Sequence, residues 1–225
     1  MTANKKKVLV TICSRNPNFD HLSLNIDYFK KLLKERDFTI CIIDSDSTIF
    51  TEYKKIEEKY PDVKIHYVKN KHYEYGAYKY SYYHYPDYDL YVCIQDTVIF
   101  IKKINLDLVS DSLAYIFRHH SGFLLDHRSI HFAMKVLKNS PFTYPDYAND
   151  PDPLVRRFPM NHHCSFITTN HNMKDIFETL TIPPRNKLNS RSYERLFGLY
   201  FIFRNIKTIN LRQLKVVQKI HGKRK

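Results

Sequence analysis

The sequence predicts an α/β fold in which helices flank a mostly parallel central sheet. Three observations support this prediction. Apolar runs of strand length, rich in β-branched residues, occur at 7–13, 38–44 and 90–95. Segments with apolar residues at helical spacing lie between these runs, and polar or proline-containing turns separate them. Such alternation is typical of βαβ units, in which successive strands run parallel.

The first strand and the helix after it have clear boundaries. The strand at 7–13 is expected to end before Asn16-Pro17-Asn18. Asp20 is the expected N-cap of the helix, because its carboxylate can accept hydrogen bonds from the first turn. The apolar face of this helix has residues three or four positions apart: Leu22, Ile26, Phe29 and Leu33.

The remaining elements follow the same two periodicities. Strands are expected at 38–44, 63–68, 90–95, 98–101, 113–117 and 163–168. Helices are expected at 52–60, 76–84, 129–137, 172–180 and 190–204. The segment 141–159 is rich in Pro, Asp and Tyr and is expected to form a long loop. We expect a single domain over 1–225, with halves 1–101 and 102–225.

Charge and composition limit the classes of function. The chain has 225 residues and a formal net charge of +13, and 43% of its residues are hydrophobic, which is typical of a globular protein. The charge suits nucleic acid, an anionic membrane or a small phosphorylated substrate as partner, or a basic surface without a specific partner. The basic tail from Arg212 onward is the segment that would meet an anionic membrane surface.

Glycine and cysteine are both scarce. With only 4 glycines, neither G-x-G-x-x-G nor G-x-x-x-x-G-K occurs, which argues against standard dinucleotide-binding enzymes and P-loop NTPases. The cysteines form no C-x-x-C motif, so we expect buried free thiols in a reducing compartment. No signal peptide or membrane span is evident, and we expect a cytoplasmic protein. The four cysteines are Cys13, Cys41, Cys93 and Cys164.

Closely spaced histidines occur at His119-His120, at His127 with His131, and at His162-His163-Cys164. None has the H-E-x-x-H spacing of a metalloprotease, so the sequence does not favour a zinc site. We expect His162-His163-Cys164 to lie in a loop that precedes a strand.

Polar clusters follow three of the predicted strands, at Ser14-Arg15, Asp44-Ser45-Asp46 and Gln95-Asp96. The carboxyl ends of parallel strands lie at one edge of a sheet, and ligands of open α/β sheets bind there. We therefore expect the three clusters to meet in one crevice.

Residues 7–101 resemble the nucleotide-sugar-binding half of GT-A fold glycosyltransferases. The segments that carry the resemblance follow one another in the order VLVTIC, CIIDSDS and NKHYEYGAYKYSYYHYPDYDLYVCIQDT. The resemblance implies a GT-A sheet, with Asp44 on the base or ribose of the donor and Asp96 as the metal-binding aspartate of a D-x-D motif. The motif here is Gln95-Asp96-Thr97, with one carboxylate. The other donor-binding residues that we expect are Thr11, Arg15, Gly76, Lys79 and Gln95.

The C-terminal half adds two residues by resemblance to the same family. Glu194 matches the helix-start acid that acts as base toward the acceptor hydroxyl in inverting members. His221 matches the C-terminal metal-binding histidine, which would complete a Mn²⁺ or Mg²⁺ site with Asp96. Each residue also has a structural reading: Asp44 as a turn residue, Glu194 as an acid favoured by the helix dipole, and His221 as part of a basic tail.

The resemblance implies a metal-assisted glycosyltransferase with a nucleotide-diphosphate-sugar donor, a UDP-sugar in the first instance. The acceptor is a hydroxyl of a glycan, a protein or a lipid-linked molecule. Two alternatives stay open. The single carboxylate of Gln95-Asp96-Thr97 suits a degenerate domain that binds a sugar nucleotide without turnover. The charge and the 18 tyrosines suit a nucleic-acid-binding protein, although no nucleic-acid-binding signature occurs.

Overall fold

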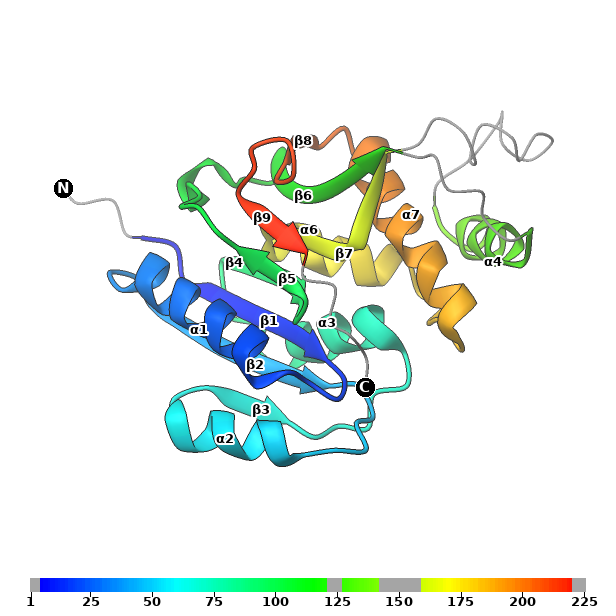
Figure 1. Cartoon of the computed structure of the whole chain (residues 1–225). Helices are drawn as coiled ribbons and strands as arrows, with labels where there is room; N and C mark the ends of the chain where they lie inside the picture. Colours follow the sequence, from blue (N-terminus) through cyan, green and yellow to red (C-terminus); the bar gives the residue numbers. More distant parts are fainter. Residues whose placement is uncertain (1–4, 121–126, 142–158, 220–225) are drawn as a thin grey trace.

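The computed structural model describes residues 5–120, 127–141 and 159–219. Its centre is a seven-stranded sheet with the order β3-β2-β1-β4-β7-β6-β8 (Figure 1). Neighbouring strands pair in parallel except where β7 pairs with β4 and with β6, so the predicted mostly parallel sheet is confirmed. The strands are β1 (Val8–Ser14), β2 (Phe38–Asp44), β3 (Lys64–His66), β4 (Leu90–Gln95), β6 (Leu113–His120), β7 (Pro159–Thr169) and β8 (Lys207–Asn210).

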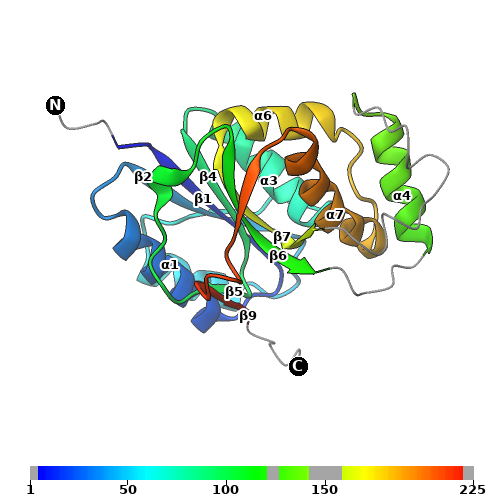
Figure 2. The same cartoon turned by 90° about the horizontal axis from the view of Figure 1, so that it is seen from above.

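Helices cover both faces of the sheet, as the sequence predicts (Figures 1 and 2). One face packs on α1 (Phe19–Leu33) and α2 (Thr51–Lys59), and the other on α3 (Tyr73–His84), α6 (Asn170–Thr179) and α7 (Lys187–Phe203). Helix α4 (His127–Lys138) packs against α7. A short second sheet pairs β5 (Val98–Phe100) with β9 (Val217–Lys219), and a 3₁₀ helix spans Leu106–Leu108.

The alternation along β1 explains this layering. Val8, Val10 and Ile12 point to the α1 and α2 side, whereas Leu9 and Cys13 belong to the core on the α3 side. Strands buried on both faces read as continuous apolar runs, which is why β1, β2 and β4 were predictable. The four apolar residues predicted to form the inner face of α1 are all buried: Leu22, Ile26, Phe29 and Leu33. The four cysteines are buried and unpaired, as expected.

Several sequence-based expectations need correction. The N-cap of α1 is Asn18 and not Asp20, because Asn18 has extended backbone and its side-chain oxygen accepts a hydrogen bond from the His21 N–H. The strand predicted at 63–68 is confined to Lys64–His66. The chain beyond Arg212 is not simply a basic tail, because Val216 and Val217 are buried and β9 pairs with β5.

None of the helices in the described residues combines the length and the apolar character that a membrane-spanning helix requires.

Candidate functional site

The three predicted polar clusters meet at the carboxyl edge of the parallel strands. The Ser14 hydroxyl at the end of β1 donates a 2.7 Å hydrogen bond to Oδ2 of Asp96, which follows β4. The Ser45 N–H after β2 donates to the Ser14 carbonyl at 2.8 Å. The Asp96 N–H donates to the Cys13 carbonyl at 3.1 Å. The ends of β1, β2 and β4 therefore form one hydrogen-bonded edge.

Strand β7 brings an irregular segment to the same edge. The segment contains His162, His163 and Cys164, which lie within β7 and not, as expected, in a loop that precedes the strand. Because β7 runs antiparallel to β4, the beginning of β7 lies beside the end of β4, and their pairing stops at Cys93 and Phe166. In the pairing between β6 and β7, Ile116 lies opposite Phe166, and the next pair is Arg118 with Asn161. An advance of two residues along β6 therefore corresponds to five residues along β7. This β7 bulge, residues 162–165, therefore emerges next to Gln95 and Asp96.

Helix α7 has no acid in its first turn, so Glu194 lies farther along the helix than the expected helix-start position. The helix directs Glu194 at the β7 bulge. The His163 N–H donates a 3.1 Å hydrogen bond to Oε1 of Glu194, and Nδ1 of His163 lies 3.9 Å from the same oxygen. The ring centroids of His162 and His163 are 3.6 Å apart. One ligand atom from each of His162, His163 and Glu194 lies within 4.8 Å of the others. Sequence reasoning identified Glu194 but missed its proximity to the two histidines.

A second carboxylate at this edge, Glu74, was not predicted. Its Oε1 accepts a hydrogen bond from the Gln95 side-chain amide, and its Oε2 accepts one of 3.0 Å from the Ser190 hydroxyl. Glu74 thereby joins α3, β4 and α7. Burial, with a contribution from the Glu74 carboxylate, raises the pKa of the Cys13 and Cys164 thiols well above the ordinary value. These thiols are therefore neutral packing residues and not nucleophiles.

Gly76 makes the start of α3 possible. A Cβ atom at this position would lie 2.1 Å from Oδ1 of Asn70 and 2.7 Å from Cβ of His72. The Asn70 amide in turn donates a 3.0 Å hydrogen bond to the Ser45 hydroxyl. Gly76 therefore allows the loop before α3 to lie against the end of β2, and its contact with a donor stays a prediction.

The Asp44 carboxylate faces inward. Asp44 is 2% exposed, and its oxygens accept hydrogen bonds from the Ser47 N–H and from the Tyr53 hydroxyl at 3.2 Å and 3.0 Å. In this arrangement Asp44 closes the turn that follows β2. Its contact with the base or ribose of a nucleotide stays a prediction.

The position of Thr11 contradicts the predicted donor contact. Thr11 has no exposed surface, lies within β1, and donates a 2.9 Å hydrogen bond to the Ser81 hydroxyl on α3. It is therefore a buried packing residue. Arg15 is exposed at the end of β1, and Nζ of Lys79 lies 5.7 Å from the ring centroid of Tyr75. Donor contacts of Arg15 and Lys79 stay predictions.

Asp96 offers the donor chemistry that Mg²⁺ or Mn²⁺ prefers. Its carboxylate is partly exposed, and the neighbouring Gln95 and Thr97 add an amide oxygen and a hydroxyl. Hard divalent cations take such oxygen ligands. Because Glu74 lies against the Gln95 amide, it supplies a negative charge next to the position where a second motif aspartate is missing. His221 lies outside the described residues.

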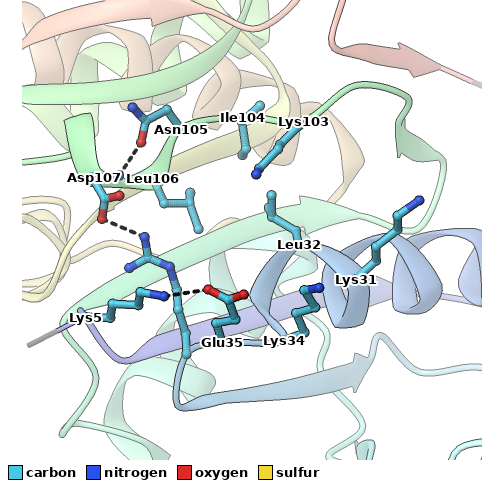
Figure 3. Close-up of a pocket in the computed structure, with 11 residues that line it drawn as sticks. Lys5, Lys31, Leu32, Lys34, Glu35, Lys103, Ile104, Asn105, Leu106 and Asp107 are labelled. Atoms are coloured by element: carbon cyan, nitrogen blue, oxygen red, sulfur yellow. Dashed lines mark hydrogen bonds and ion pairs between the residues drawn. The ribbon is translucent and has the colours of Figure 1, made fainter.

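A cavity of about 590 Å³ lies at the opposite edge of the sheet, between the end of α1 and the segment before the 3₁₀ helix (Figure 3). Two ion pairs cross it: Lys5 with Glu35 at 2.8 Å, and Arg36 with Asp107 at 2.6 Å. Three further lysines line it, Lys31, Lys34 and Lys103. Because this cavity lies at the amino ends of the strands, its basic side chains do not surround Asp96.

The comparisons with known proteins give no assignment. The chain matches no protein-family model and no curated protein. The chemistry of the carboxyl edge therefore carries the functional argument.

Proposed function

We propose that the chain is a glycosyltransferase of the GT-A type that moves a sugar from a nucleotide-diphosphate donor, a UDP-sugar in the first instance, to an acceptor hydroxyl. The observation that carries the proposal is the carboxyl edge itself. An oriented aspartate after β4 lies beside β1, and two further carboxylates, Glu74 and Glu194, lie at the same edge. The sheet order and the antiparallel β7 next to β4 are compatible with that fold type.

The donor side would use Asp96, with Gln95 and Thr97, to hold Mn²⁺ or Mg²⁺. A bound divalent cation supplies charge neutralisation for the diphosphate leaving group. The Ser14 hydroxyl fixes the carboxylate of Asp96 through Oδ2. Arg15, an exposed residue at the end of β1, would contact phosphate oxygens of the donor. These roles make binding of the donor dependent on both the metal and Asp96.

The acceptor side would use Glu194 as a general base. The acceptor oxygen forms a bond to the anomeric carbon while the bond from that carbon to the diphosphate breaks, and the hydroxyl proton passes to a carboxylate. Glu194 is held by the His163 N–H, which fixes one of its oxygens at the edge. This role predicts that Glu194→Gln abolishes transfer while donor binding persists.

Calorimetric titration with UDP and UDP-sugars, with and without Mn²⁺, tests the donor half of this proposal. We expect metal-dependent binding that is lost in Asp96→Asn and kept in Asp87→Asn, an exposed aspartate in the turn before β4. Absence of binding to every nucleotide sugar would contradict the proposal. Unchanged binding by Asp96→Asn would refute the metal assignment alone.

A domain that binds a sugar nucleotide without turnover is the second candidate, and the single carboxylate of Gln95-Asp96-Thr97 favours it. Donor binding without hydrolysis or transfer over a panel of acceptors would select this candidate. The nucleic-acid alternative loses support, because the tyrosines that would stack on bases include Tyr53, Tyr75, Tyr78 and Tyr91, which have at most 1% of their surface exposed.

A further inference from the structure

We propose that His162, His163 and Glu194 form a binding site for a transition-metal ion of the zinc class, separate from the Asp96 position. One ligand atom from each residue lies within 4.8 Å of the others. The two histidines come from the β7 bulge and the carboxylate from α7, so the site would join two elements far apart in the sequence. The inference stands on these residues alone and does not require glycosyltransferase activity.

The backbone of the bulge brings the two imidazoles together. Adjacent residues of a regular strand point to opposite faces of the sheet. His163 and Cys164 instead have φ angles of 55° and 50°, in the left-handed region that non-glycine residues seldom adopt. As a result the rings of His162 and His163 lie with centroids 3.6 Å apart, close to Glu194. Strained conformations of this kind persist chiefly at functional sites.

The ligand chemistry favours a borderline metal over Mg²⁺. Two imidazoles and one carboxylate form the protein ligand set of known catalytic zinc sites and leave one coordination position open. Ligands about 2.1 Å from a tetrahedral zinc ion are roughly 3.4 Å apart. Because the ligand atoms of the cluster lie within 4.8 Å of one another, no pair has to approach by more than about 1.4 Å. Metal binding would therefore have to draw the side chains of His162, His163 and Glu194 closer together.

The side-chain amide of Asn161, which precedes the two histidines, is a separate observation because it is buried without a hydrogen-bond partner in the described part of the chain. It has no exposed surface, and neither Oδ1 nor Nδ2 has a hydrogen-bond partner in the described part of the chain. Buried amides are nearly always hydrogen-bonded. If this amide faces the cluster, a water bound to the ion would supply a partner, as hydrogen-bonding neighbours of metal ligands commonly do.

Metal binding and base catalysis would be alternative uses of Glu194. A carboxylate that coordinates zinc cannot also accept the proton of an acceptor hydroxyl. If Glu194 is the base, zinc at this site inhibits transfer in a manner that added donor does not relieve.

The direct test uses the full chain without a histidine tag, freed of metal with a chelator. Zinc is titrated in competition with a chromophoric chelator, and Co²⁺ is used as a spectroscopic probe. We expect one equivalent of Zn²⁺ to bind, with an affinity lowered at least about tenfold in His162→Ala and in Glu194→Gln. His171→Ala, which removes an exposed histidine at the start of α6, is the matched control and is expected to bind like the parent.

Further measurements distinguish the loss of a metal ligand from a failure to fold. His163→Asn removes the imidazole but keeps a residue type that tolerates the left-handed conformation, so it reports on the ligand and not on folding. Thermal unfolding of each metal-free variant identifies any that fail to fold. No binding by the parent, or equal binding by His162→Ala and Glu194→Gln, would overturn the proposal. A sulfur-to-cobalt charge-transfer band would overturn this ligand set by indicating Cys164, and loss of zinc in Asp96→Asn would overturn the separation of the two sites.

Discussion

The Ser14 hydroxyl and the Asp96 carboxylate are joined by a 2.7 Å hydrogen bond that crosses from the end of β1 to the residue after β4. A hydroxyl in this position fixes one carboxylate oxygen and limits the rotation of the side chain. The orientation of Asp96, the proposed metal ligand, therefore depends on the register in which the buried strands β1 and β4 pair.

Ser14→Ala is expected to weaken Mn²⁺-dependent binding of UDP-sugars. A hydrogen bond to a charged group contributes about 1.5–3 kcal/mol, which corresponds to roughly ten- to hundredfold in affinity. Calorimetric titration measures the change. Ser112→Ala, an exposed serine at the other edge of the sheet, is the control and is expected to bind normally. Equal affinity in Ser14→Ala and the parent would show that orientation of Asp96 is unimportant.

Gly76→Ala is expected to lower the free energy of unfolding by about 1–3 kcal/mol, as measured by urea denaturation. Alanine has the higher helix propensity by about 1 kcal/mol, but the new Cβ would lie 2.1 Å from Oδ1 of Asn70. The steric clash therefore outweighs the propensity gain.

The double variant Gly76→Ala/Asn70→Ala separates the clash from other effects. Removing the Asn70 amide eliminates the closest contact, so the effects of the two substitutions are expected to be less than additive. Strict additivity would mean that the loop before α3 is not held against Gly76.

Glu74→Ala is expected to destabilise the fold and to loosen the carboxyl edge. Gln95 and Ser190 would both lose their acceptor, at a cost of about 1–3 kcal/mol for partly buried groups. Urea denaturation measures the loss. Glu178→Ala on α6 removes an exposed carboxylate 3.9 Å from Lys174 and is expected to cost less than about 1 kcal/mol. A loss no larger than that of the control would contradict the bridging role.

His66 is expected to make the protein less stable in mild acid. Burial, together with the positive charges of His84 and Lys64, lowers the pKa of His66 from its ordinary value of 6.5. The folded state then binds fewer protons than the unfolded state, so the free energy of unfolding falls as the pH drops below 6.5 and levels off below the folded-state pKa.

The pH dependence of His66 can be isolated by difference. His66→Gln is expected to lose this part of the slope in urea denaturation between about pH 5 and pH 7. In the His84→Ala variant, NMR titration of the His66 ring is expected to give a higher pKa, because one neighbouring charge is gone. A pKa of His66 unchanged by that substitution would contradict the electrostatic explanation.

The regular part of the fold was predictable because a strand that is buried on both faces of the sheet consists of a continuous run of apolar residues. Strands β1, β2 and β4 were located to within one residue from their apolar runs. The N-cap of α1 was misplaced because Asn18 and Asp20 both have capping side chains, and the extended backbone at Asn18 decides between them.

The candidate site was only partly predictable. Polar residues at strand ends identified Ser14 and Asp96, since parallel strands place such ends together. The pairs Glu74–Ser190 and His163–Glu194 are separated by 116 and 31 residues. The proximity of His163 and Glu194 depends on the bulge of β7, and that of Glu74 and Ser190 on the packing of α3 against α7. Neither feature leaves a periodic signal in the sequence.

The position of β7 between β4 and β6 also makes the two halves of the chain interdependent. A fragment ending at residue 101 would leave β4, with its first five residues buried in the intact fold, as an unpaired sheet edge. Such an apolar edge offers free N–H and C=O groups to another copy. The fragment is therefore expected to aggregate, and the protein to be a poor candidate for split-fragment reconstitution from separately purified halves.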